Sequence, residues 1–449
     1  MNNRNIELRR KKLEQFREQL ESGQMNAVRE MLPNGVIEQI CEDCQYYFRT
    51  RLLTPLVTVF HMISAGISRE GSFRSAWQLN GQAEQSGSLA KARKRLPLEV
   101  WERLHGWMMK EVENEDLAKV QWRGHRVIGL DGTCVSMSDT PELFECFGRR
   151  KGNYGFARFP LARMVVVFNL QTMILLGHEV GGYATGEISL LRRHLPKFRR
   201  GDVLVMDRYY GGANLYAEYQ RTGLEFINRI RQNLRVERLK IIRTLDCGDL
   251  IVEMPVNYRH RCQDCTLPKT VQVRIIHTQA KVRGQRETFW IVTSLLDPEQ
   301  YPAQEIQAWY KKRWKVEGLI EELKVWLGAD VLRSKTGEGV LKELYARIIG
   351  LNLIHWLILK AGKKHGKSPE RLSVSATLRL TAAQSLKMST APAWHLPELF
   401  EQLLDRIASS TVPYRPDRIE PRMIRRDTKH YPALKITRTE WRALYAQAA

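Results

Sequence analysis

The spacing of hydrophobic positions divides the chain into a helical beginning, a strand-rich middle and a helical end. Apolar residues recur every three or four positions in segments 52–67 and 96–112, which is the spacing of a helix with one buried face. Segments rich in β-branched residues and bounded by turn residues follow from about 125 to 293. Helical spacing returns at about 303 and continues to about 405.

The strand-rich middle predicts a mixed sheet with helices on its faces. Two predicted helices, at 188–198 and 214–223, alternate with the later strands, whereas the earlier strands follow one another directly. The predicted strands are 125–137, 162–170, 173–181, 201–212 and 224–230. A further β-rich run at about 232–290, with alternating polarity in 249–256 and 270–278, reads as an insertion before the last helix of the sheet region.

One predicted helix, YKKRWKVEGLIEELK at 310–324, carries an unusual charged stripe. At roughly 100° per residue, Tyr310, Arg313, Glu317 and Lys324 fall within about 60° of one another. Apolar residues occupy an adjoining stripe: Trp309, Val316, Ile320, Leu323 and Leu327. The charged stripe is therefore expected at a cleft edge, although a solvated helix with an incidental Arg313–Glu317 ion pair is the alternative.

Two predicted strands each deliver an aspartate, Asp131 in RVIGLD and Asp207 in DVLVMD. A carboxylate that follows an apolar strand lies at the carboxyl edge of a sheet, where polar ligands bind. Either residue alone could equally be a turn or cap residue. Together with Glu317 they would place three like charges in one cleft. Hard divalent cations usually offset the repulsion between such carboxylates. Two Mg²⁺ or Mn²⁺ ions there would support in-line phosphoryl transfer, with Arg313 and Lys324 holding neighbouring phosphates.

Charge points to a polyanionic partner. The chain has 71 Lys and Arg against 49 Asp and Glu, a net charge of +22, for which nucleic acid is the first candidate. A membrane surface is disfavoured because the best apolar run, 348–362, is short and contains Asn352 and His355, so we predict a buried core helix there. The first 21 residues lack an apolar signal segment and predict a polar amphipathic helix, so a cytoplasmic location is expected.

Seven cysteines fit reduced thiols better than a disulfide framework. Two pairs, Cys41 with Cys44 and Cys262 with Cys265, have metal-like spacing, and His260 lies near the second pair. A shared zinc site would require these distant segments to meet. Residues 412–442 carry nine Lys and Arg against four acidic residues and predict an extended basic tail along a phosphate backbone.

These residues resemble a known family. Asp131 in GLDGT, Asp207 in VMDRYY and the signature Y-x2-R-x3-E-x6-K at Tyr310, Arg313, Glu317 and Lys324 look like the DDE transposases of bacterial insertion sequences, in the group named after insertion sequence four. The resemblance implies cut-and-paste movement of a DNA element flanked by inverted repeats. It also implies Mg²⁺ or Mn²⁺ as cofactor, double-stranded DNA as partner, a homodimer bridging two DNA ends, and a nucleoid-associated bacterial protein.

The resemblance also implies a division of the chain around an RNase H-like core. The expected parts are a helical DNA-binding domain at 1–115, the core at 116–230 and 291–405, the β-rich insertion at 231–290, and the basic tail at 406–449. Family members hold a flipped base against a tryptophan, and the placement of Trp290 is similar to that residue. A core tryptophan is the alternative.

Other readings remain open at this stage. An RNase H-like nuclease or domesticated relative would cut DNA without strand transfer, and only an assay with target DNA separates it from a transposase. A DNA-binding protein without activity would be expected to lack at least one of the three carboxylates. A tyrosine recombinase with Tyr310 as nucleophile would want an Arg-His-Arg cluster, for which the sequence offers no clear candidate.

Overall fold

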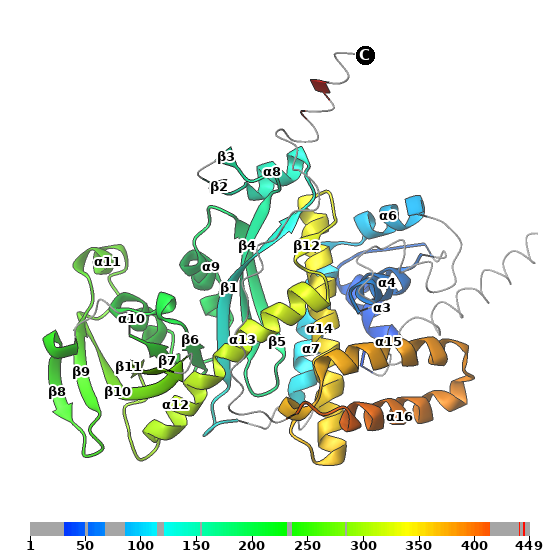
Figure 1. Ribbon diagram of the computed structural model, residues 1–449. Helices are drawn as coiled ribbons and strands as arrows, with labels where there is room; N and C mark the ends of the chain where they lie inside the picture. Colours follow the sequence, from blue (N-terminus) through cyan, green and yellow to red (C-terminus); the bar gives the residue numbers. More distant parts are fainter. Residues whose placement is uncertain are drawn as a thin grey trace, which may run out of the picture.

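The computed structural model describes residues 31–49, 53–67, 86–114, 121–152, 155–230, 236–282, 285–413, 440 and 443–444. Within these residues a large sheet lies beside a bundle of helices, and the long helix α14 (Gly337–His365) stands between them (Figure 1). The helix expected at the extreme N-terminus and most of the expected basic tail lie outside the described residues.

A ten-stranded mixed sheet forms the centre, as the sequence predicts. Its order is β5-β4-β1-β6-β7-β11-β10-β9-β8, and β12 pairs with the far end of β1. The strands are β1 (Val127–Met137), β4 (Leu161–Asn169), β5 (Leu175–Gly182), β6 (Val203–Met206), β7 (Glu225–Arg229), β8 (Lys240–Thr244), β9 (Leu250–Pro255), β10 (Thr270–Val282), β11 (Gln285–Thr293) and β12 (Val331–Leu332).

The three central strands β1, β6 and β7 run parallel, whereas β4 and β5 are antiparallel to β1 and to each other. In the parallel register Gly129 lies opposite Val205, so two residues further along both strands come Asp131 and Asp207. Asp131 does not stand at the end of its own strand, as a carboxylate that follows an apolar strand would, because β1 continues to Met137. Asp131 nevertheless stands level with the end of β6, since that neighbouring strand ends at Met206.

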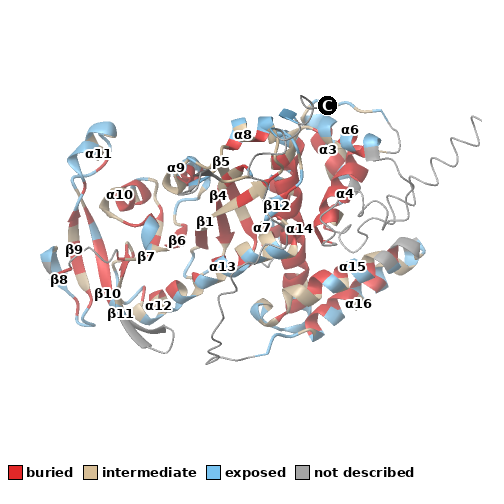
Figure 2. Ribbon diagram, turned by 45° about the horizontal axis from the view of Figure 1, so that its top comes forward, coloured by how far each residue is buried: buried red, intermediate tan, exposed pale blue. Residues whose placement is uncertain are grey.

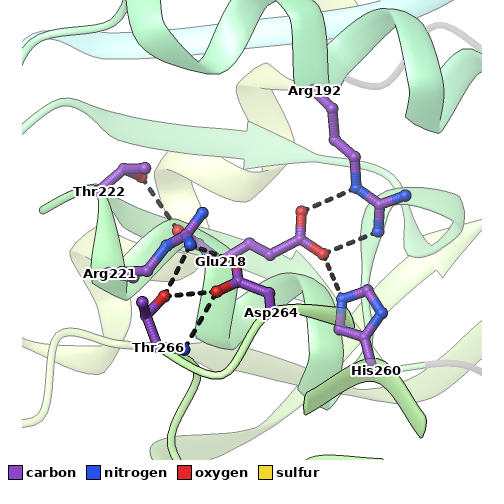
Figure 3. A network of polar contacts seen from close by, with 7 residues as sticks. All are labelled: Arg192, Glu218, Arg221, Thr222, His260, Asp264 and Thr266. Atoms are coloured by element: carbon purple, nitrogen blue, oxygen red, sulfur yellow. Dashed lines mark hydrogen bonds and ion pairs between the residues drawn. The ribbon is translucent and has the colours of Figure 1, made fainter. Parts of the chain in front are cut away.

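The strands of the expected insertion extend the central sheet. Thr293 of β11 pairs antiparallel with Ile227 of β7, and β10, β9 and β8 follow outward. The turn helix α11 (Tyr258–Gln263) is tied to α10 (Ala213–Arg221) by polar contacts (Figure 3). The Glu218 carboxylate lies 2.6 Å from His260 Nε2 and accepts two hydrogen bonds from Arg192. The insertion is therefore continuous with the core, not a separately folded sheet.

Different helices cover the two faces of the sheet. On one face, α12 (Ala303–Lys312), α13 (Trp314–Glu321) and the start of α14 pack over residues such as Val127 and Val205. On the other, α9 (Glu187–His194) and α10 pack over residues such as Ile128 and Leu204. This alternation follows from the period of two along a strand, and it assigns Asp131, an odd-numbered residue of β1, to the α13 face.

The N-terminal helices share a core with the C-terminal ones. Phe60, Trp101, Leu353 and Leu403 belong to one buried cluster, although they come from four helices widely separated in sequence. Figure 2 shows the buried residues of these helices turned toward α14. The helices concerned are α3 (Asn34–Asp43), α4 (Pro55–Ile67), α7 (Leu98–Asn114), α14, α15 (Val374–Thr390) and α16 (Leu396–Ser409). Helix α6 (Ser86–Arg95) contacts α4.

Helix α14 is the one helix in the described ranges that is long and apolar enough to cross a membrane. Most of it is buried inside the fold, so the predicted buried core helix at 348–362 is confirmed. Short elements complete the described chain: α8 (Pro141–Phe147), the hairpin β2 (Lys151–Gly152) and β3 (Gly155–Phe156), a π-helix (Glu322–Trp326), and 3₁₀ turns at Leu195–Lys197, Arg208–Tyr210, Val236–Arg238, Pro369–Arg371 and Ala393–His395.

Candidate active site

An open cavity of about 420 Å³ lies where the central parallel strands meet α13. It brings together five of the residues singled out from the sequence and three that were not. The lining residues are Asp131, Asp207, Arg208, Arg229, Tyr310, Arg313, Trp314 and Glu317. Three carboxylates from segments far apart in the sequence therefore face one space, and cations surround them.

The two aspartates are fixed by local backbone contacts. Asp131 Oδ1 accepts a hydrogen bond of 2.7 Å from the backbone N–H of Gly132. The Asp207 side chain caps the short 3₁₀ turn that follows it by accepting from the Tyr209 backbone N–H. The backbone carbonyl of Asp207 is held by the buried Asn228 amide at 2.6 Å. Each carboxylate thus has a defined starting position at the sheet edge.

Glu317 reaches the same space because α13 lies very close to β1. A Cβ atom added at Gly129 would come within 2.5 Å of Val316 Cγ2, so this approach requires a residue without a side chain. Val316 directly precedes Glu317, and its contact with β1 sets the height of the helix above the strand. The sequence pattern could not reveal this close approach.

Arg313 pairs with Glu317 in the cavity. The Arg313 Nη2 atom lies 3.2 Å from Glu317 Oε1. The guanidinium is almost fully buried, whereas about half of the Glu317 side chain is exposed. The ion pair that a solvated helix would also form is therefore present, but its cation lies inside the fold and not in solvent.

The electrostatic field of the cavity acts on Asp131. Burial raises the pKa of this carboxyl from 3.8 to about 6, and the neighbouring Asp207 and Glu317 charges push it in the same direction. The Gly132 hydrogen bond and the Arg313 charge oppose that rise in pKa. A bound cation would lower this raised pKa again, because it stabilises the charged form of the carboxylate.

The donors suit a hard divalent cation, since three carboxylates face one space. The three carboxylates do not surround a common ion position: in the described part of the chain, no three His, Cys, Asp or Glu side chains lie close enough together to hold a metal. The Arg313–Glu317 pair accounts for part of this, because Arg313 already neutralises one of the three carboxylates. The residues therefore fit a divalent ion by chemistry and position, with Glu317 required to exchange partners.

Tyr310 lines the cavity from α12 and is buried. Its ring centroid lies 5.8 Å from that of Phe289 on β11. Burial raises the pKa of its phenol, so the hydroxyl is kept neutral and can donate to a phosphate oxygen.

Lys324 does not join the stripe predicted from helical spacing. The predicted single helix is interrupted at Arg313 and changes to a π-helix at Glu322–Trp326, and Lys324 lies within this π-helix. Lys324 Nζ pairs with Asp330 at 3.1 Å and is not among the residues lining the cavity. The predicted position of Lys324 on the stripe is therefore wrong, while its role at a phosphate stays a prediction.

Trp290 is likewise absent from the cavity lining. Its indole ring lies 4.8 Å from the His277 ring and packs beside the core on the face opposite α13. Its strand neighbour Phe289 points to the α13 face and carries the Arg229 guanidinium 4.5 Å from its ring centre. Base stacking on Trp290 remains a prediction.

Three lining residues were missed in the sequence: Arg208, Arg229 and Trp314. Arg229 comes to the site through sheet register, because Met206 pairs with Asn228 and the next residues are Asp207 and Arg229. Only knowledge that β6 and β7 are adjacent and parallel could have found it. Arg208 and Trp314 each directly follow a predicted site residue, which was the available signal.

The two cysteine pairs do not meet. Cys41 is buried at the end of α3 and Cys44 follows it, whereas Cys262 and Cys265 are exposed at α11. Figure 1 shows α3 and α11 at opposite ends of the molecule. A zinc site shared by the two pairs, which the spacing left open, is therefore ruled out by this arrangement.

A family model identifies the family of the chain. Residues 122–353, more than half of the chain and including every cavity residue, match the family described as Transposase DDE domain. The protein named Transposase InsG for insertion sequence element IS4, from Escherichia coli strain K12, is 24% identical over 316 residues, which cover 69% of this chain and 70% of that protein. A piggyBac transposase synaptic complex with hairpin DNA covers 85% of both chains at 9% identity and a TM-score of 0.42. The chain belongs to the DDE transposases of the insertion-sequence-four family.

Proposed function

We propose that this transposase cleaves DNA at the terminal inverted repeats of an insertion sequence and joins the freed element to target DNA, with Asp131, Asp207 and Glu317 as its catalytic carboxylates. The observation that carries the proposal is their convergence on one cavity. The sheet supports an RNase H-like core, because β5-β4-β1-β6-β7 combines an antiparallel meander with parallel strands on the other side of β1.

DDE transposases generally use divalent metal ions. Here Asp131, Asp207 and Glu317 would hold two Mg²⁺ or Mn²⁺ ions, and these ions would supply activation of the attacking oxygen and stabilisation of the leaving oxygen. The chain's own cations act on the substrate. Arg313, buried beside Glu317, would turn to a DNA phosphate once its carboxylate partner is drawn away, and Arg229 from β7 reaches the same cavity.

The phosphates flanking the reacting one need fixed partners as well. Tyr310 contributes a neutral hydroxyl, and Lys324 lies just beyond the cavity, paired with Asp330. We further propose a homodimer that bridges two DNA ends, and a cytoplasmic protein associated with the bacterial nucleoid. The net charge of +22 supports both the DNA partner and that location.

A cleavage assay tests the proposal. The substrate is a duplex that carries the inverted repeats flanking the gene, incubated with Mg²⁺ or with EDTA. A separate plasmid serves as target DNA. Mg²⁺-dependent nicking at the repeat boundary, followed by joining to the plasmid, is expected. Nicking without joining would instead identify a nuclease, and tight binding with no nicking would contradict the catalytic role.

A further inference from the structure

A second cationic surface lies beyond the active site, at the far end of β1. Between Cys146 and Arg163 the chain carries four Lys and Arg residues and no acidic residue. This stretch follows α8 and includes the β2–β3 hairpin, which Figure 1 shows at the end of β1 past α13. We call the surface the α8 platform and define it by Arg149, Arg150, Lys151, Arg158, Arg333 and Lys335.

Aromatic rings orient two of the cations of the α8 platform. The Arg149 guanidinium lies 5.0 Å from the centre of the Phe144 ring, and that of Arg158 lies 5.3 Å from the centre of the Phe159 ring. Phe159 is itself 42% exposed. A guanidinium placed over an aromatic ring has less freedom to lose when it binds an anion than an unsupported side chain.

The segment after β12 adds Arg333 and Lys335, both exposed, to the same surface. Its backbone is firmly held: Ser138 Oγ donates to the Arg333 carbonyl and Thr140 Oγ1 to the Lys335 carbonyl, each at 3.1 Å. Buried Glu343 accepts from the Arg333 backbone N–H at 3.0 Å. The cations therefore project from a rigid base.

Two of the acidic residues near the α8 platform are engaged in contacts within the fold. Glu142 of α8 accepts a hydrogen bond from the Gly337 backbone N–H at 3.0 Å. Glu338 pairs with Lys342 at 2.9 Å. The surface therefore keeps a cationic excess.

The α8 platform and the active site share one face of the sheet. Leu143 and Phe147 of α8 belong to the same buried cluster as Val316 and Leu319 of α13. Along β1, Asp131 and Ser136 are five residues apart, which in an extended strand is roughly 17 Å. That length corresponds to about five base pairs of duplex at 3.4 Å each.

We propose that the α8 platform binds backbone phosphates of the DNA duplex about five base pairs from the reacting phosphate. The inference rests on the proposed function, because it takes the cavity as the place of cleavage. The bound duplex belongs either to the terminal repeat or to DNA outside the element, and the chemistry of the phosphates is the same in both.

The first test measures how the affinity for a 40-base-pair duplex of arbitrary sequence depends on salt. The variant R150A/K151A/K335A removes three exposed charges, and R243A/R259A/K269A, in the distal strands and turn, removes three elsewhere. We expect the first variant to lower the slope of log affinity against log salt by about 2 to 3, since each phosphate contact contributes roughly 0.9. The control should change it by much less. Equal changes in both variants, or none in the first, would overturn the proposal.

A second test identifies the DNA, using one duplex that ends at the repeat boundary and one that continues into flanking sequence. A defect of R150A/K151A/K335A with both duplexes assigns the α8 platform to the repeat, and a defect with the longer duplex alone assigns it to outside DNA. If R150A/K151A/K335A binds both duplexes with wild-type affinity, the α8 platform does not bind DNA. If the wild-type protein binds but never cleaves, the proposed function fails, while the salt slopes still decide the platform.

Discussion

The buried guanidinium of Arg313, at the junction of α12 and α13, lies 3.2 Å from the half-exposed carboxylate of Glu317. The cation is therefore the fixed member of the pair and the carboxylate the movable one. Because Asp131 and Asp207 already face the same cavity, a divalent ion there would draw Glu317 toward them and leave Arg313 available for a phosphate. In the proposed function, the pair would link the binding of a divalent ion to the binding of a DNA phosphate.

Replacing Glu317 by glutamine should abolish cleavage and leave DNA binding intact or tighter. The amide keeps the shape of the side chain but removes a charge that attracts metal and repels DNA. The loss of several kcal/mol of transition-state stabilisation corresponds to a rate at least roughly a hundredfold lower. Single-turnover nicking and a binding titration, run side by side, measure both effects. Wild-type nicking rates would remove Glu317 from the active site.

Gly129→Ala should damage catalysis through the position of α13. The new methyl group would meet Val316 and Leu170 at 2.5 and 2.7 Å, and relieving that overlap moves the helix at a cost of about 1–3 kcal/mol. Gly318→Ala is the matched control, because nothing lies within 4 Å of its added Cβ and the change should stabilise α13 by about 0.5–1 kcal/mol. Thermal unfolding and nicking rates are measured for both. Full activity of Gly129→Ala would show that Glu317 tolerates a shifted helix.

Asp131→Asn should stabilise the protein at neutral pH but not in acid. Because the folded pKa of Asp131 is about 6, above its ordinary 3.8, its contribution to stability is present below pH 4 and is lost as pH rises through 6. The variant should therefore match the wild type near pH 4 and exceed it at pH 7.5 by roughly 1–2 kcal/mol, a value reduced for partial exposure. Chemical denaturation at both pH values gives the difference.

Adding Mg²⁺ at pH 7.5 should reduce the difference in unfolding free energy between Asp131→Asn and the wild type. The ion binds the folded wild type and relieves the repulsion, whereas the variant has lost a ligand. EDTA should restore the original difference. An equal effect of Mg²⁺ on both proteins would mean that Asp131 takes no part in binding the ion.

Lys324→Ala should weaken DNA binding and reduce its salt slope by about 0.9, the value of one phosphate contact. Asp330→Asn should act in the opposite direction, because it releases Lys324 from an ion pair of 3.1 Å. Affinities at several salt concentrations test both variants. An unchanged slope of log affinity against log salt for Lys324→Ala would mean that Lys324 contacts Asp330 and no DNA phosphate.

The carboxylates and most strands could be predicted because their signals are local. Asp131 and Asp207 follow apolar β-branched runs, and the charged signature around Glu317 lies within fifteen residues. Helices α9 and α10 were likewise predictable, since their apolar spacing depends only on neighbours along the chain.

By itself, then, the sequence determined the family to which the chain belongs, and it singled out the side chains that we propose supply the chemistry. Tertiary structure alone decided how they meet. The parallel register that sets Asp131 beside Asp207 and brings in Arg229, and the approach of α13 over Gly129, both arise from contacts between distant segments. Local periodicity does not predict strand pairing and packing, because each depends on the shape of a partner that lies far away in the chain.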